Sequence, residues 1–245
     1  MVPFQRDEVP YLSTEQMVEV DRAMVEDLGI ELIQMMENAG RNLAHLARAR
    51  FLGGDPRGKR VVVMAGTGGN GGGALVCARR LHNWGAGVEV LTTRPDEDFA
   101  PVPAHQLGIL RRMRVEVGAP PVPGGERVAD LIVDGIIGYS LKGSPRGAAG
   151  ELIRQANAQG SPVLALDVPS GVDATSGIAC DPAVEATATM TLALPKEGLR
   201  VRGARAQVGE LYLADIGVPP SLYAEPALGL RVGSIFSESD VVRLS

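Results

Sequence analysis

Short apolar runs alternate with helical segments along most of this sequence. Strand-like runs recur at residues 61–64, 88–92, 114–117, 131–137, 163–168, 187–194 and 211–216. Helical patterns lie between several of these runs. The alternation predicts a mostly parallel sheet, because parallel neighbours are joined by crossovers that are usually helices. We therefore expect a three-layer α/β/α Rossmann-like sandwich that binds its ligand at the carboxyl ends of the strands.

A helical preface, at about residues 10–52, comes before the first strand. Ser13 and Gln16 have the spacing of a capping box, and apolar residues then repeat at helical spacing until Gly29. A second helix is expected at about residues 31–51. The Pro/Gly-rich connections, such as residues 118–125, are too short to be linkers between domains. The chain, residues 1–245, is therefore expected to form a single domain.

A glycine-dense segment at residues 65–75 separates the first strand from a helical pattern. Glycines let backbone N–H groups approach a ligand, and a helix start adds unpaired donors and partial positive charge. The segment predicts a site for an anionic diphosphate. Gly66, Gly68 and Gly71 match a G-x-G-x-x-G spacing, but no acidic residue ends the next strand. The alternative is a tight structural turn that binds no ligand.

Three further polar features follow strand-like runs. Asp134 interrupts an apolar run, so we expect a cation or several hydrogen-bond donors near its carboxylate, or a role in capping a neighbouring turn. Residues 138–144 form a polar loop able to wrap a ligand, although Lys142 also fits a solvated surface lysine. The run at residues 163–168 brings Asp167 and Ser170 into a Pro/Gly turn, and Asp167 lies where α/β enzymes place their chemistry.

Composition excludes several classes of function. The net charge of -5, without a basic cluster, argues against nucleic acid or an anionic membrane as a partner. Cys77 and Cys180 lack metal or redox spacing, which fits a reducing, cytoplasmic location without disulfides. No leader or membrane-spanning run is evident, and we interpret none of the three histidines as catalytic. Serine-hydrolase and transition-metal signatures are also absent from the sequence.

Five motifs occur in the order seen in the NAD(P)H-hydrate epimerases. They lie at residues 35–41, 66–75, 133–138, 167–171 and 195–199. The chain resembles the YjeF N-terminal domain over nearly its full length. This resemblance implies a Rossmann-type sandwich, often dimeric, and an isomerase that epimerises hydrated NADH or NADPH (NADHX or NADPHX) at C6 of the nicotinamide-derived ring. A separate NAD(P)H-hydrate dehydratase then repairs both epimers.

The resemblance also implies roles for individual residues. Asn70, Asp134 and Ser170 are expected to bind a potassium ion, since a hard cation prefers oxygen ligands. An acid or base would help hydroxide leave C6, and water would return on the other face of a planar iminium. Asp167 is the first candidate for that acid or base and Lys142 the second. The substrate is expected to contact Asp167 and two loops, which comprise Gly69, Asn70, Gly71, Gly72, Gly73, Gly138, Tyr139, Ser140, Leu141, Lys142, Gly143 and Ser144.

The chain departs from the family pattern within the glycine-dense segment. Relatives typically read Asn-Asn-Gly-Gly-Asp-Gly, whereas residues 69–74 read Gly-Asn-Gly-Gly-Gly-Ala, so Gly73 replaces a carboxylate. The loss corresponds to about one charged hydrogen bond, or a few kcal/mol at most. A second hypothesis is therefore a non-catalytic, nucleotide-binding or dimerising scaffold of the same family. The retained Asp134 and Asp167 favour the enzyme, and the preference between the NADH and NADPH hydrates stays open.

Overall fold

The central sheet has eight strands in the order β3-β2-β1-β4-β5-β6-β7-β8. A computed structural model describes residues 2–5, 8–119 and 128–245, so most of the connection expected at residues 118–125 lies outside the described residues. The strands are β1 (Arg60–Ala65), β2 (Gly87–Thr92), β3 (Glu116–Gly118), β4 (Leu131–Gly135), β5 (Val163–Leu166), β6 (Ala188–Leu192), β7 (Glu210–Ala214) and β8 (Val241–Arg243). All neighbours pair in parallel except β7 and β8, which are antiparallel. The expected Rossmann-like sandwich is confirmed.

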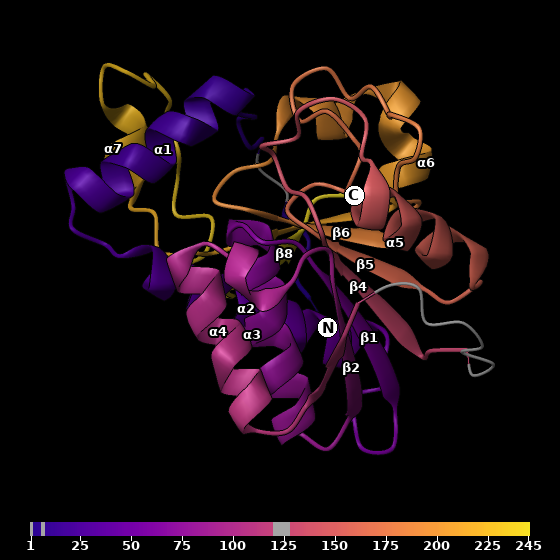
Figure 1. Ribbon diagram of the computed structural model, residues 1–245. Helices are drawn as coiled ribbons and strands as arrows, with labels where there is room; N and C mark the ends of the chain where they lie inside the picture. Colours follow the sequence, from indigo (N-terminus) through magenta and orange to yellow (C-terminus); the bar gives the residue numbers. More distant parts are fainter. Residues whose placement is uncertain (1, 6–7, 120–127) are drawn as a thin grey trace.

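Helices cover both faces of this sheet (Figure 1). The α-helices are α1 (Thr14–Glu26), α2 (Leu32–Arg50), α3 (Gly69–Asn83), α4 (Pro101–Arg112), α5 (Gly147–Ala158), α6 (Arg205–Val208) and α7 (Pro220–Ala224). Short 3-10 turns occupy Asp96–Asp98, Glu197–Arg200 and Arg202–Ala204. In Figure 1, α2, α3 and α4 lie together on one face, and α5 and α6 lie on the other.

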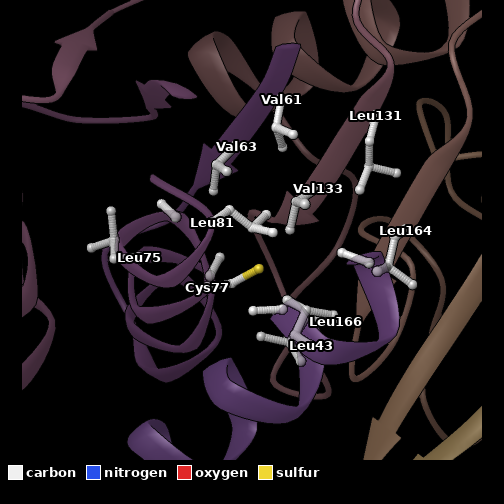
Figure 2. Packing of buried hydrophobic residues seen from close by; sticks show 14 of the residues in the cluster. Leu43, Val61, Val63, Leu75, Cys77, Leu81, Leu131, Val133, Leu164 and Leu166 are labelled. Carbon is white, nitrogen blue, oxygen red and sulfur yellow. The ribbon is translucent and has the colours of Figure 1, made fainter. Parts of the chain in front are cut away.

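The strand β1 shows why both faces of the sheet are apolar. Val61 and Val63 pack in the core beneath α2, α3 and α4, whereas Val62 and Met64 pack in the core beneath α5. Successive strand residues point to opposite faces, so a sheet covered on both sides needs continuous apolar strands. Figure 2 shows leucine and cysteine side chains of α2 and α3 meeting the strand residues on the first of these faces.

The helical preface is confirmed, but its two helices have different partners. The capping box of α1 is present: the Ser13 N–H donates to Gln16 Oε1 at 2.9 Å, and the Gln16 N–H donates to Ser13 Oγ at 3.2 Å. The helix α1 ends at Glu26 rather than continuing to Leu28, which is exposed. Whereas α2 packs against α3, α1 lies beside α7 and belongs to a separate apolar cluster (Figure 1).

Several strands are shorter than the apolar runs predicted. The strands formed by the runs at residues 131–137, 163–168 and 187–194 end at Gly135, Leu166 and Leu192. The residues beyond these points are still mostly buried, so hydrophobicity alone does not mark the end of the strand. The strand β8 was not predicted, because three residues carry too little pattern.

An ion pair joins the end of α2 to the start of β7 and gives the fold a pH-dependent contribution. Arg50 donates to both carboxylate oxygens of Glu210, at 2.9 and 3.0 Å, and the Tyr212 hydroxyl donates at 2.7 Å. Hydrogen bonding from Arg50 is the main cause that lowers the Glu210 pKa to about 2, from an ordinary value of 4.5. The stabilisation is therefore present above the ordinary glutamate pKa and is lost as the pH falls toward 2.

We expect Glu210→Gln to lower the free energy of unfolding by about 1 kcal/mol at neutral pH, the upper range for a partly exposed ion pair. The difference from wild type should shrink as the pH falls through the acid range, because the wild-type carboxylate then becomes protonated. Urea unfolding of both proteins at several pH values measures it. Glu238→Gln, at an exposed position, is the control. A difference that does not change with pH would contradict the assignment.

Candidate active site

A cavity of about 260 Å³ lies where β4, β5 and β6 end. Its walls come from both helices of the preface, from the start of α3 and from the residues after these strands. The lining residues are Met17, Asp21, Leu32, Met35, Met36, Ala39, Gly69, Asn70, Gly73, Gly138, Tyr139, Ser140, Leu166, Asp167, Leu192 and Ile216. Most of them are apolar, and Asp21 and Asp167 are the two carboxylates that line this largely apolar space. We refer to this space as the reaction cavity.

A second cavity, of about 500 Å³, adjoins the reaction cavity. The two share Gly69, Asn70, Gly138 and Ser140. The second cavity lies between the ends of β1 and β4, where the strand order reverses, which is the usual ligand crevice of open α/β sheets. Two arginines, Arg94 after β2 and Arg146 before α5, contribute positive charge to it. We refer to it as the arginine cavity.

The glycine-dense segment has a different structure from the turn expected. The helix α3 begins at Gly69, so the glycines at positions 69–73 form its first turns rather than a loop ahead of it. A Cβ on Gly66 would lie 2.0 Å from the Ile136 carbonyl oxygen, and one on Gly71 would lie 1.8 Å from that of Gly66. These two glycines therefore permit close backbone packing. For them, the alternative of a structural role in a tight turn holds.

The surroundings of Gly68 favour the ligand-binding interpretation instead. It precedes α3 as its N-cap, has no side-chain cap, and a Cβ there would meet nothing within 4 Å. Gly68, Gly69 and Asn70 line the arginine cavity, which therefore lies at the start of α3, where the first N–H groups of a helix have no partner within the helix. This arrangement favours an anion, as the sequence predicted.

Asp167 lies directly after β5 with its carboxylate fixed from two sides. Its backbone is in the left-handed region, with φ at 67°. Lys196 Nζ donates to Asp167 Oδ1 at 2.5 Å, and the Tyr139 N–H donates to Oδ2 at 3.1 Å. Lys196 is fully buried and also donates to the Leu192 carbonyl oxygen at 2.8 Å. The carboxylate is therefore held, ion-paired, at the wall of the reaction cavity.

Lys196 was not predicted as a site residue, although it lies in the motif at residues 195–199. Lys196 follows the apolar run at residues 187–194 by two positions, and only the fold shows that its side chain turns inward. The segment around it pairs with the preface: the Leu12 N–H donates to the Pro195 carbonyl at 2.8 Å, and the Glu197 N–H donates to the Leu12 carbonyl at 2.9 Å. Lys196 is thereby fixed beneath the reaction cavity.

Tyr139 links Asp167 to the opposite wall of the reaction cavity. Its hydroxyl donates to Asp21 Oδ2, on α1, at 2.5 Å. Burial raises the pKa of Asp21 above its ordinary value, and the hydrogen bond from Tyr139 opposes this only in part. Asp21 is a second site residue that was not predicted, since the sequence of α1 has only an amphipathic pattern.

Asp134 lies behind the cavity walls and is completely buried. Its carboxylate accepts hydrogen bonds from Ser170 Oγ at 2.6 Å, the Ser170 N–H at 2.8 Å and the Ile136 N–H at 3.1 Å. Burial raises its pKa to about 6 despite these bonds. Such bonds match the donors expected for a buried carboxylate, and they also tie together the turns after β4 and β5.

Asn70 supplies the observation that fits a cation. Its Oδ1 and Nδ2 are both buried and have no hydrogen-bond partner within the described part of the chain. The amide packs near Gly138, whose Cβ, if present, would lie 3.3 Å from Oδ1. A buried carbonyl oxygen without a donor suits a hard monovalent cation, so Asn70 fits the expected potassium site chemically. The other two expected ligands already bond to each other, because Asp134 accepts two of its three hydrogen bonds from Ser170.

The structure brings together part of the predicted substrate site. Gly69, Asn70, Gly73, Gly138, Tyr139, Ser140 and Asp167 line the reaction cavity. Gly71 and Gly72 are buried, while Lys142, Gly143 and Ser144 are exposed. None of these five, nor Leu141, is among the residues lining either cavity.

Gly73 occupies the position where relatives carry a carboxylate. A Cβ there would lie 2.9 Å from Leu166 Cδ2, so a side chain at position 73 enters space that Leu166 fills.

The three histidines line neither cavity as far as the structure describes them. Within the described ranges, no three His, Cys, Asp or Glu side chains gather as a metal site, and no helix is both long and apolar enough to cross a membrane.

Comparison with protein families matches residues 32–198 to the YjeF-related protein N-terminus. An NAD(P)H-hydrate epimerase of Dehalogenimonas lykanthroporepellens is 47% identical over 86% of this chain and 84% of its own. An NAD(P)H-hydrate epimerase of Pirellula staleyi is 34% identical over 84% of this chain and 92% of its own. The family match includes every residue that lines the arginine cavity, whereas Met17, Asp21 and Ile216 of the reaction cavity lie outside it.

Two further comparisons bear on length and fold. A bifunctional NAD(P)H-hydrate repair enzyme Nnr of Moorella thermoacetica is 35% identical over 91% of this chain, which spans 43% of that enzyme. The crystal structure of the yeast protein ynu0 superposes with a TM-score of 0.81 at 25% identity, covering 96% of this chain and all of the yeast chain. The fold is thus shared across nearly the whole sequence.

Proposed function

Because this chain belongs to the family of the YjeF-related protein N-terminus, we propose that it is an NAD(P)H-hydrate epimerase, an isomerase that interconverts the R and S epimers of NADHX and NADPHX. The epimerase expected from the five motifs agrees with the names of relatives that cover most of the chain. The observation that carries the proposal is the buried, ion-paired Asp167 carboxylate at the wall of a cavity in the sheet's ligand crevice.

The reaction needs a proton donor, a proton acceptor and a stabilised cation. When hydroxide leaves C6, the lone pair of the ring nitrogen forms a C=N bond, and the ring becomes a planar iminium. Asp167 is the group that accepts the proton of the water returning to C6, and its negative charge lies where the iminium charge develops. Lys196 and the Tyr139 N–H hold that carboxylate in place. The catalytic role expected for Lys142 stays a prediction from the resemblance.

The two cavities divide the substrate between them. The apolar walls formed by Met35, Met36 and Leu166 suit the flat, damaged ring and limit its exposure to water. The arginine cavity, with Arg94, Arg146 and the start of α3, suits the diphosphate of the same molecule. Asn70 and Gly138 line both cavities. A substrate that occupies both cavities therefore contacts the two segments predicted to bind it, at residues 69–73 and 138–144.

Potassium is the cofactor we propose, with Asn70, Asp134 and Ser170 as its ligands. The ion would supply positive charge that neutralises the buried Asp134 and orders the backbone around the substrate. Asn70 is the residue to change, because its amide atoms have no other partner in the described residues.

Potassium should raise the Tm of the wild-type protein. At tenfold excess over its Kd it adds about 1.4 kcal/mol of stability through mass action. Asn70→Ala should remove most of this increase, because the orphaned carbonyl oxygen is gone. Thermal unfolding in potassium and in tetramethylammonium chloride, at equal ionic strength, measures the effect. Equal Tm values of the wild type in the two salts would contradict the site.

The remaining proposals concern assembly and location. We place the enzyme in the cytoplasm as a homodimer of single-domain chains that bind neither nucleic acid nor membranes, and the free Cys77 and Cys180 suit a reducing compartment. Relatives named bifunctional repair enzymes join a similar region to further sequence. For this chain we propose a functional link to a separate dehydratase that consumes one epimer.

A coupled assay tests the proposed function. A dehydratase specific for one epimer consumes that epimer of an NADHX mixture quickly and then waits for spontaneous epimerisation. Addition of this protein should let the reaction run to completion at the fast rate. An unchanged slow phase at high protein concentration would leave only the scaffold hypothesis, which the missing carboxylate at Gly73 favours.

A further inference from the structure

The helix α1 brings a second carboxyl group, that of Asp21, to the wall of the reaction cavity. On the premise that the proposed epimerase activity is correct, we propose that Asp21 is a catalytic residue that acts on the face of the substrate ring opposite to Asp167. The reaction requires such a group, because hydroxide leaves one face of the ring and water returns to the other. One fixed carboxylate cannot lie close to C6 on both faces of a ring bound in a single orientation.

The geometry places the two carboxylates on opposite walls of one cavity. Asp21 and Asp167 both line the reaction cavity, one from α1 and the other from the end of β5. Tyr139 spans the distance between them: its N–H donates to Asp167 Oδ2 at 3.1 Å, and its hydroxyl donates to Asp21 Oδ2 at 2.5 Å. One tyrosine residue therefore connects the two carboxyl groups, which reach the same cavity from different elements of the fold.

Their surroundings give the two carboxyl groups different protonation. Asp167 is paired with the buried ammonium of Lys196, whereas Asp21 has no ion pair within the residues described and accepts a bond from a neutral phenol. Burial is the main cause that raises the pKa of Asp21, and the Tyr139 hydrogen bond and the Lys196 charge offset this only in part. Two carboxyl groups whose environments differ in this way are suited to act as an acid and a base.

The supporting structure fixes both groups relative to each other. The helix α1 starts with the capping box at Ser13, one residue after Leu12. Leu12 in turn exchanges backbone hydrogen bonds with Pro195 and Glu197, on either side of Lys196. The chain segment that orients the Asp167 partner thus also anchors the helix that carries Asp21.

The proposed step balances as follows. Asp21 gives its proton to the C6 hydroxyl as the C6–O bond breaks, so that water leaves and the nitrogen lone pair forms the iminium. A water molecule on the other face adds to C6 and gives its proton to Asp167. For the opposite epimer the two residues exchange roles, and protons exchange with solvent between turnovers.

The first test uses Asp21→Asn, which preserves size and can still accept the Tyr139 hydroxyl bond. We expect kcat for epimerisation to fall about 1,000-fold, within the range of general acid–base catalysis, while the Tm and the Kd for NADH stay near wild type. Glu26→Gln, an exposed change on the same helix, is the matched control. Epimerisation by Asp21→Asn at the wild-type rate would overturn the proposal.

The second test separates loss of a proton donor from a structural effect. In Asp167→Asn, the epimer whose hydroxyl faces Asp21 should still exchange its C6 oxygen with oxygen-18 water without inversion, because Asp21 alone can give and take back the proton. The double variant Asp21→Asn/Asp167→Asn should lose this exchange. Mass spectrometry of each purified epimer, corrected for the rate without protein, measures it.

Equal oxygen exchange in the single variant Asp167→Asn and in the double variant would also overturn the proposal. Failure of the proposed function is distinguishable, because the wild-type protein would then neither epimerise NADHX nor exchange its oxygen. Circular dichroism of every variant shows that the folded proteins are being compared.

Discussion

Asp167→Asn is expected to lower the rate of NADHX epimerisation about 1,000-fold with the fold retained. The amide has the shape of the carboxylate, and its oxygen can still accept the hydrogen bond that Lys196 donates at 2.5 Å. It cannot, however, take a proton from the incoming water, nor does it carry the negative charge that stabilises an iminium. The loss should therefore appear in kcat, with a small change in KM.

Steady-state kinetics on each purified epimer measures this prediction, and Asp98→Asn, at an exposed position, is the matched control. A rate within threefold of wild type would remove Asp167 from the chemistry. A large rise in KM at unchanged kcat would instead make it a residue that only binds substrate.

Lys196→Met is expected to lower the free energy of unfolding by about 3–5 kcal/mol, because it leaves the buried Asp167 carboxylate without its cation. Lys196 is fully buried and Asp167 is 4% exposed, so neither charge is solvated by water. Removal of one partner from such a pair costs far more than removal of an exposed one. Urea unfolding monitored by circular dichroism gives the magnitude.

The double variant Asp167→Asn/Lys196→Met should recover much of this loss, since no buried charge is then left alone. Lys59→Met is the control: Lys59 is 42% exposed and pairs with Asp130 at 3.3 Å, so its removal should cost less than 1 kcal/mol, about the limit for a surface pair. If Lys196→Met were as mild as Lys59→Met, the buried pair would not support the site.

The fold follows from the sequence because apolar runs and glycines carry local information. Continuous runs such as Val61 to Met64 predict strands that are covered on both faces, and the capping box at Ser13 predicts the start of α1. The ends of the strands are harder to predict, because residues such as Val168 remain buried after the backbone has left the sheet.

Some residues of the candidate site, like parts of the fold, are predictable from local sequence, and others are not. Asp134, Asp167 and Ser170 are identifiable because each is a polar residue at the end of an apolar strand. Lys196 and Asp21 are not, because their positions depend on contacts between distant segments: Lys196 turns beneath Asp167, and α1 brings Asp21 to Tyr139. A lysine and an aspartate in helical or loop sequence usually face solvent, so no local pattern marks the inward orientation of these two side chains.

The glycine-dense segment shows how two interpretations of one motif can both hold. Gly66 and Gly71 are required by backbone atoms that a Cβ would meet, whereas Gly68 has free space around it and precedes the unpaired N–H groups of α3. Spacing alone treats these glycines as equivalent. The requirement at Gly66 depends on Ile136, from a distant part of the chain, whereas the requirement at Gly71 comes from the carbonyl oxygen of Gly66.

The most direct test of the account is the epimerisation of a single pure epimer. Pure S or R NADHX, incubated with catalytic amounts of the protein, should relax to the same equilibrium mixture from either side, much faster than without protein, as resolved by chromatography. Asp167→Asn should abolish the acceleration. Relaxation at the spontaneous rate from both epimers, with folded wild-type protein and potassium present, would contradict the central claim that the cavity beside Asp167 and Lys196 is an epimerase site.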